Sequence, residues 1–196
     1  MARSAGVTRQ RILKAAYLEF RRKGYSRVGV DQIAANAKIT KRTLYYHFKS
    51  KDALLAAVFK QQHELVIVAY ESIEKSMSDD PHDLVGKIFT DLERWSSKPR
   101  WSGSGFTRIA MELADLPGHP ARAITKRHKA AAEAHLAGRL AERGVKEAPE
   151  RAREIWMLAE GAMTMILIHG DRSYARTAGL AAKRLLPAPR KSRRKR

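Results

Sequence analysis

The sequence contains no cysteine, so disulfide bonds and thiol chemistry are both excluded. It also lacks any apolar run close to the roughly 18 residues that a membrane-spanning helix needs. Its first residues contain no signal-peptide hydrophobic region, and the chain shows no strand pattern and no internal repeat. We therefore expect an all-α protein of the cytoplasm that has no membrane partner.

Acidic residues are scarce relative to basic ones, with 20 Asp and Glu against 39 Lys and Arg. Residues 1–52 carry 13 basic and 3 acidic side chains, and residues 187–196 carry six basic side chains and no acidic one. Residues 53–186 are nearly balanced, with 20 basic and 17 acidic side chains. The charge is thus concentrated at the two ends of the chain, which indicates a polyanionic partner. Nucleic acid and an anionic membrane surface both fit this charge, and of the two we expect nucleic acid.

Recognisable catalytic motifs are also missing. His63-Glu64 lacks the second histidine of a zinc-protease pair, and Gly103-Ser104-Gly105 lacks the outer glycines of a nucleophile elbow or phosphate loop. His128 and His135 are seven residues apart on one predicted helix, but no carboxylate or cysteine accompanies them as a third ligand. We expect no enzyme, no metal site and no cofactor.

The most informative stretch is residues 40–52, which predicts a short helix followed at once by the start of another. Thr40 and Ser50 are N-cap residue types, and Leu44 and Phe48 share one helix face. The rest of that surface is cationic, hydroxylated or aromatic, as a DNA groove requires. The candidate base-edge contacts are Lys41, Arg42, Thr43 and Tyr45, and the candidate phosphate contacts are Thr40, Tyr46, His47 and Lys51.

Two further helices are predicted upstream. Thr8 is placed to cap a helix that ends near Lys23, before Gly24, and residues 1–7 are expected to form a basic, mobile arm. Residues 30–37 form a second short helix, joined by Lys38 and Ile39 to the polar helix after it. Two short helices and a tight turn describe a helix-turn-helix. A three-helix core of about 50 residues is marginal alone, so it should pack against the helices C-terminal to it.

Residues 8–59 resemble the N-terminal DNA-binding domain of the TetR (tetracycline repressor) family of bacterial transcriptional regulators. The resemblance is carried by Ile12-Leu13-x-Ala15-Ala16-x-x-x-Phe20-x-x-x-Gly24-Tyr25, by Ile33-Ala34, and by Thr40-x-x-Thr43-Leu44-Tyr45-x-His47-Phe48-x-Ser50-Lys51-Asp52-x-Leu54. Two positions depart from the family pattern. Gly29 replaces the usual Thr or Ser cap, and Lys38 replaces the usual turn glycine, at a cost of roughly 1 kcal/mol if the backbone there is left-handed.

The resemblance implies a second helical domain for ligand binding and dimerisation. We expect a helix-turn-helix domain at residues 1–52, a long linking helix at about 51–76, a helical domain at 53–186 and a disordered basic tail at 187–196. The family's last two long helices form the homodimer interface, here about 150–169 and 173–186. Candidate interface residues are Leu158, Ala162, Met163 and Ile166, although each also suits a core within the domain.

Bulky side chains of the second domain are the candidate lining of an effector pocket, with core packing again the alternative. These candidates are Trp95, Trp101, Phe106, Met111 and Trp156, with Glu112 and His135 as candidate polar anchors of the same pocket. The prediction is a ligand-responsive repressor, nucleoid-associated in the cytoplasm, that binds a pseudo-palindromic operator as a homodimer and responds to a lipophilic small molecule. The alternatives are a non-specific architectural DNA-binding protein and an enzyme without a recognisable motif. The effector, the operator, the regulated genes and the role of the tail do not follow from the sequence.

Overall fold

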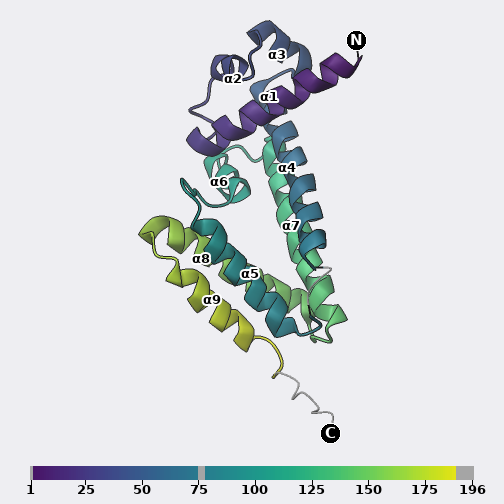
Figure 1. Cartoon of the computed structure of the whole chain (residues 1–196), viewed down its shortest axis with the longest axis vertical. Coiled ribbons are helices and arrows are strands. Elements are labelled where there is room, and N and C mark those ends of the chain that lie inside the picture. Colours follow the sequence, from purple (N-terminus) through teal and green to yellow (C-terminus); the bar gives the residue numbers. More distant parts are fainter. Residues whose placement is uncertain (1, 75–77, 189–196) are drawn as a thin grey trace. The chain divides into compact units, whose positions relative to one another are not determined.

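The computed structural model describes residues 2–74 and 78–188, and within these ranges the chain forms nine α-helices and no strand (Figure 1). The prediction of an all-α fold is confirmed. Of the described helices, none is long and apolar enough to cross a membrane. The end of the predicted linking helix and most of the predicted tail lie outside the described residues. The helices are α1 (Ala2–Lys23), α2 (Val30–Asn36), α3 (Lys41–His47), α4 (Lys51–Glu74), α5 (Pro81–Ser96), α6 (Gly105–Glu112), α7 (Pro120–Glu142), α8 (Ala148–His169) and α9 (Ser173–Arg184).

Side-chain caps set several of the helix starts. The side chain of Asp80 accepts a hydrogen bond of 2.8 Å from the backbone N–H of His82, and Pro81 occupies the first turn of α5. The first helix begins earlier than expected, at Ala2 rather than after Thr8. No proline interrupts residues 2–7, so the helix continues through the segment that was expected to be a mobile arm.

The packing divides the chain into two compact units. Unit 1 comprises Met1–Tyr70 and Ser104–Lys129, and unit 2 comprises Glu71–Gly103 and Ala130–Arg196. The grouping joins residues 104–129 to the N-terminal helices, whereas the expected domain boundary lies near residue 52. The two compact units describe packing, whereas the boundary near residue 52 is a prediction of where the DNA-binding part of the chain ends.

Unit 1 has a core to which α6 and α7 contribute together with α1 to α4. Fully buried Ile12, Ile33 and Leu44 from the first three helices share this core with Phe106 and Ile109 of α6. The helix-turn-helix therefore does not depend on a three-helix core alone, as its small size predicts.

The core of unit 1 also contains a pair of histidines from α4 and α7. The Nδ1 atoms of His63 and His128 lie 3.0 Å apart, and the His128 ring stacks on Phe106 at 3.7 Å between ring centres. His128 is only 5% exposed. Burial first, and then the charges of Lys129 and His63, lower the pKa of His128 to about 4.

Unit 2 is built around α5, α8 and α9. Its core contains Leu84, Val85 and Phe89 of α5 with Ile155 and Ile166 of α8. The approach of α9 to α5 is close at Gly179, where an added Cβ would lie 2.9 Å from the Cβ of Phe89. Phe89 is 3% exposed, so its ring has no room to move aside.

Candidate nucleic-acid interface

The turn between α2 and α3 adopts the left-handed backbone that the family pattern assigns to glycine. Lys38 has φ 53°, and the N–H of Ile39 donates a hydrogen bond of 3.0 Å to the carbonyl of Ala34. The guanidinium of Arg11, on α1, donates to the carbonyls of Ala37 and Lys38, the latter at 3.0 Å. Arg11 thus ties α1 to the turn and holds the angle between the two short helices.

The start of α3 is fixed as the sequence predicts. The side chain of Thr40 accepts a hydrogen bond of 3.1 Å from the N–H of Thr43, and the two hydroxyls lie 2.9 Å apart. Leu44 is fully buried and Phe48 is 5% exposed, so the face they share is anchored in the core of unit 1. The opposite face of α3 must then point to solvent.

That outer face consists of cations, hydroxyls and aromatic rings. Tyr46 is 82% exposed and Tyr45 43%, and Lys41 and Arg42 are exposed beside them. Thr43 and His47 are half-buried. Lys41 forms an exposed ion pair of 3.1 Å with Asp31 of α2. Such a pair is worth at most about 1 kcal/mol, so a phosphate or base edge can compete for the lysine.

Lys51 lies apart from this face, at the start of α4. Its ammonium lies 4.2 Å from the centre of the Tyr25 ring, which is a cation–π contact. Burial lowers the pKa of Lys51, although the charges of Asp52 and Glu112 act in the opposite direction. The Tyr25 hydroxyl donates to Asp52, and burial followed by that contact raises the pKa of Tyr25. Lys51 therefore has a packing role inside unit 1 besides the phosphate contact predicted for it.

The comparison with known proteins gives the same assignment. The family model described as bacterial regulatory proteins, tetR family, matches residues 12–58. The HTH-type transcriptional regulator TtgW of Pseudomonas putida is 33% identical over 101 residues, which are 46% of this chain and 75% of that protein. The chain belongs to the TetR family. The resemblance identified from the sequence is confirmed, and so is a DNA-binding transcriptional regulator at the level of the family.

Other TetR-family relatives agree over different lengths. The HTH-type transcriptional repressor SCO4008 of Streptomyces coelicolor is 29% identical over 157 residues, 76% of this chain and 69% of that protein. The Tn10 TetC protein of Escherichia coli is 38% identical over 72 residues, so the match spans about a third of its length (36%) and 37% of this chain. The residues that the family model matches, 12–58, contain the helix-turn-helix.

The TetR fold itself extends over most of the chain. The structure of SCO4454, a TetR-family transcriptional regulator from Streptomyces coelicolor, has a TM-score of 0.80 at 24% identity, covering 91% of this chain and 93% of that one. The reduced form of NemR from Escherichia coli has a TM-score of 0.83 at 17% identity, covering 94% of this chain and 100% of that one. At these identities the comparison establishes the fold alone.

The residues predicted to line a TetR effector pocket fall in both units. Trp95 and Trp101 of unit 2 meet edge to face at 5.4 Å between ring centres, and Trp156 packs against the same core. His135 is half-buried on α7 in unit 2. The other three candidates, Phe106, Met111 and Glu112, lie on α6 in unit 1.

The three candidates on α6 have separate surroundings. Phe106 is buried against His128, whereas Met111 is 65% exposed. The carboxylate of Glu112 accepts hydrogen bonds from the backbone N–H groups of Tyr25 at 2.9 Å and of Ser26 at 2.7 Å. Partial burial acts to raise the pKa of Glu112, but these donors and Arg108 lower it overall. Glu112 thus anchors the α1–α2 loop, a role that its sequence context does not indicate.

The predicted interface residues on α8 do not share one surface. Ala162 and Ile166 are 5% and 3% exposed in a single chain and pack inside unit 2, while Leu158 and Met163 are half-buried. The wide apolar stripe from which these residues were predicted includes buried as well as half-buried positions of α8. On α8 and α9, the two helices predicted to form the interface, the exposed large apolar side chains are Met157, Leu167, Ile168 and Leu180.

Proposed function

We propose that this chain is a repressor that binds a double-stranded operator sequence-specifically as a homodimer and releases it when a lipophilic effector binds. The observation that carries the proposal is the outer face of α3. It presents exposed Arg42, Tyr45 and Tyr46 from a helix whose other face is anchored by Leu44 and whose start is capped by Thr40. A rigid helix with exposed hydrogen-bonding side chains suits direct readout in the major groove.

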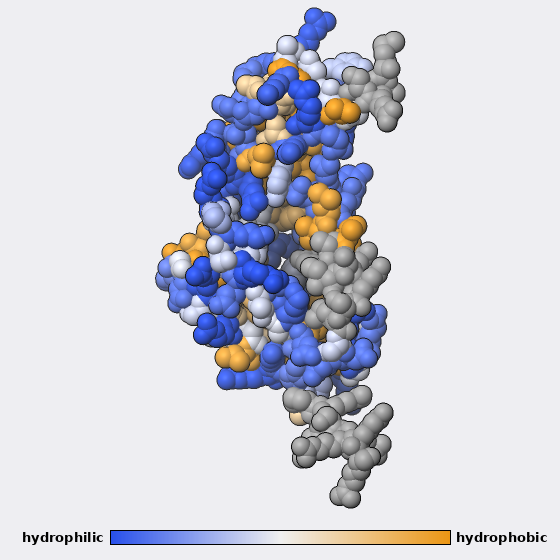
Figure 2. Space-filling view, viewed as in Figure 1, coloured by the Kyte–Doolittle hydropathy of each residue, from blue (hydrophilic) through white to orange (hydrophobic). Residues whose placement is uncertain are grey.

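The homodimer part of the proposal is supported by the outer faces of α8 and α9. Met157 and Ile168 are 68% and 66% exposed and lie on one side of α8, with exposed Gly161 between them. Leu180 of α9 is 58% exposed. Figure 2 shows hydrophobic side chains gathered where the end of α8 meets α9. An apolar face with a central glycine suits close packing against a second copy of these helices.

The effector part is supported by the three tryptophans of unit 2. Trp95, Trp101 and Trp156 belong to one cluster, and the indole N–H of Trp101 is buried without a hydrogen-bond acceptor among the described residues. A buried donor without an acceptor is costly, and a ligand oxygen would satisfy it. We therefore expect a mainly apolar effector that carries a hydrogen-bond acceptor.

The experiment that tests the proposal is the selection of bound genomic fragments at controlled salt, followed by footprinting of the recovered site. The footprint should be a pseudo-palindrome whose half-site centres are about 34–36 Å apart or a multiple of that spacing. Arg42→Ala should reduce the discrimination between the selected and scrambled sites by about 1–3 kcal/mol. Lys51→Ala should weaken binding to all sequences alike. A uniform footprint with no preference for any fragment would instead support the architectural alternative.

A further inference from the structure

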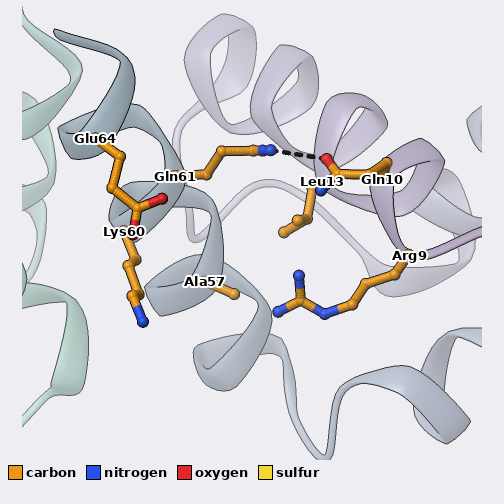
Figure 3. A pocket seen from close by; sticks show the side chains of 7 residues that line it. All are labelled: Arg9, Gln10, Leu13, Ala57, Lys60, Gln61 and Glu64. Atoms are coloured by element: carbon orange, nitrogen blue, oxygen red, sulfur yellow. Dashed lines mark hydrogen bonds between the residues drawn. The ribbon is translucent and has the colours of Figure 1, made fainter. Parts of the chain in front are cut away.

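A groove lies between α1 and α4 on unit 1, away from the residues assigned to DNA or effector above. The groove is open to solvent, has a volume of about 210 Å³ and has a floor of Leu13 and Ala57. Figure 3 shows Arg9 and Gln10 extending from α1 on one side, with Lys60, Gln61 and Glu64 on the α4 side. The amide of Gln61 donates a hydrogen bond of 2.7 Å to Gln10, so the groove is bridged at one point by a neutral pair.

The charges in this groove are not balanced by ion pairs. Neither Arg9 nor Lys60 forms a salt bridge with a carboxylate of the described residues. Glu64 lines the same groove without pairing with either cation. The Arg9 guanidinium instead lies over the ring of Phe48, at 5.0 Å from its centre. Two cations, two amides and the carboxylate of Glu64 surround the apolar floor, so the lining retains a net positive charge that would favour an anion next to Arg9 and Lys60.

We propose that the α1–α4 groove is a binding site for a small organic anion, a carboxylate or phosphate compound that pairs with Arg9 and Lys60. The guanidinium of Arg9 offers the anion a planar set of N–H donors, and the ammonium of Lys60 offers it a compact positive charge. Gln10 and Gln61 can turn their amides toward polar atoms of the same ligand. The volume of the groove suits a small metabolite.

The same groove is connected to the DNA-binding helix through Arg9. Phe48 follows α3 directly and is 5% exposed, and Arg9 covers its ring. An anion that draws the guanidinium into the groove would remove this cover from the end of α3. This regulatory consequence rests on the proposed function, whereas the binding of the anion does not.

The test is calorimetric titration of the full chain, without DNA, by citrate and separately by inorganic phosphate at constant ionic strength. We expect saturable binding of at least one probe at one site per chain. Lys60→Gln and Arg9→Gln should each weaken it about tenfold, because each removes one charged partner. Lys126→Gln, the same charge change on exposed α7 of unit 1, should leave the affinity unchanged.

Three results would overturn the proposal. The first is the absence of saturable binding by both probes, and the second is an equal loss of affinity in Lys126→Gln. The third is a DNA-binding result: if Lys60→Gln makes the slope of log K against log salt shallower by about one, Lys60 contacts a DNA phosphate instead. Because the titration contains no DNA, its failure is separate from a failure to bind an operator.

Discussion

At the scale of single residues, the buried imidazole of His128 makes stability depend on pH. Its folded pKa is lowered to about 4, below the ordinary value of 6.5, so the folded chain favours the neutral ring. The resulting stability is present above pH 6.5 and is lost as the pH falls toward 4, to a total of about 3 kcal/mol. Urea unfolding at pH 7, 5 and 4 measures this loss.

The variant His128→Phe should flatten that dependence, because the ring can still stack on Phe106 but has no proton to bind. His169→Gln removes an exposed histidine from the end of α8 and should retain the pH dependence of the unmodified chain. Equal pH profiles for His128→Phe and the unmodified chain would contradict the assignment.

Lys38 carries a backbone cost that glycine would not. Because its φ is 53°, Lys38→Gly should raise the free energy of unfolding by about 0.5–1 kcal/mol after the greater freedom of glycine in the unfolded chain is deducted. Lys38→Ala keeps a Cβ and should bring no gain. Urea midpoints of the two variants provide the measurement, and equal stability of Gly and Ala would show that the turn is unstrained.

At the scale of elements, α6 holds the α1–α2 loop through one carboxylate. Glu112→Ala removes the acceptor of the Tyr25 and Ser26 amides and should lower stability by about 1 kcal/mol. Amide hydrogen exchange should show faster exchange at both positions. Glu112→Gln retains one acceptor oxygen and should give an intermediate result.

The control for this loop is Asp115→Ala, which removes an exposed carboxylate of the same unit and should leave both amides protected. The lowered pKa of Glu112 also sets a direction with pH. Its contribution is present above the ordinary value of 4.5 and is lost as the pH falls through the lower folded value. Protection of the two amides that persists in Glu112→Ala would mean that other contacts order the loop.

The elements that the sequence predicted well are those set by local chemistry. Thr40 caps α3, and Leu44 anchors it in the core. Lys38 has the left-handed backbone at which a residue other than glycine was expected to carry a cost. These features depend on neighbours within four residues.

Long-range contacts could not be predicted in the same way. From the sequence, His128 was considered together with His135, seven residues away on the same helix. In the fold its ring contacts His63, which is 65 residues away. Glu112 suited a polar anchor in a pocket, and only the fold places the amides of Tyr25 and Ser26 within its reach. Similarly, a wide apolar stripe on α8 cannot show which side faces its own core. The exposure of Met157 and the burial of Ala162 appear only when α5 and α9 are in place.

At the scale of the whole molecule, the exposed face of α8 and α9 should determine the oligomeric state. Met157→Glu places a charge on that face and should convert the proposed homodimer to monomer, because an unpaired charge in an apolar interface is strongly unfavourable. Sedimentation analysis measures the change. Met111→Glu is a matched control, because Met111 is 65% exposed but lies on α6 in unit 1. A dimer that survives Met157→Glu would place the interface elsewhere.

The basic segment at residues 190–196, which lies outside the described residues, supports a further prediction. If its six cations grip phosphates without reading sequence, deleting it should make the salt dependence of binding shallower on selected and random DNA alike. The ratio of the two affinities should change little. An unchanged slope would leave a role in solubility alone.

The close approach of α9 to α5 at Gly179 has a consequence for symmetry. In the homodimer proposed above, a twofold axis would copy any displacement of α9 into the partner, so a shift in one chain would separate or rotate the two copies by twice that amount. A single methyl group at position 179 would meet Phe89 at 2.9 Å and force such a shift. The buried contact between Gly179 and Phe89 touches neither DNA nor a second chain, but it would limit the position of α9 and so the arrangement of the two copies. A relative with a larger residue at the position of Gly179 should accordingly have a compensating change at the position of Phe89.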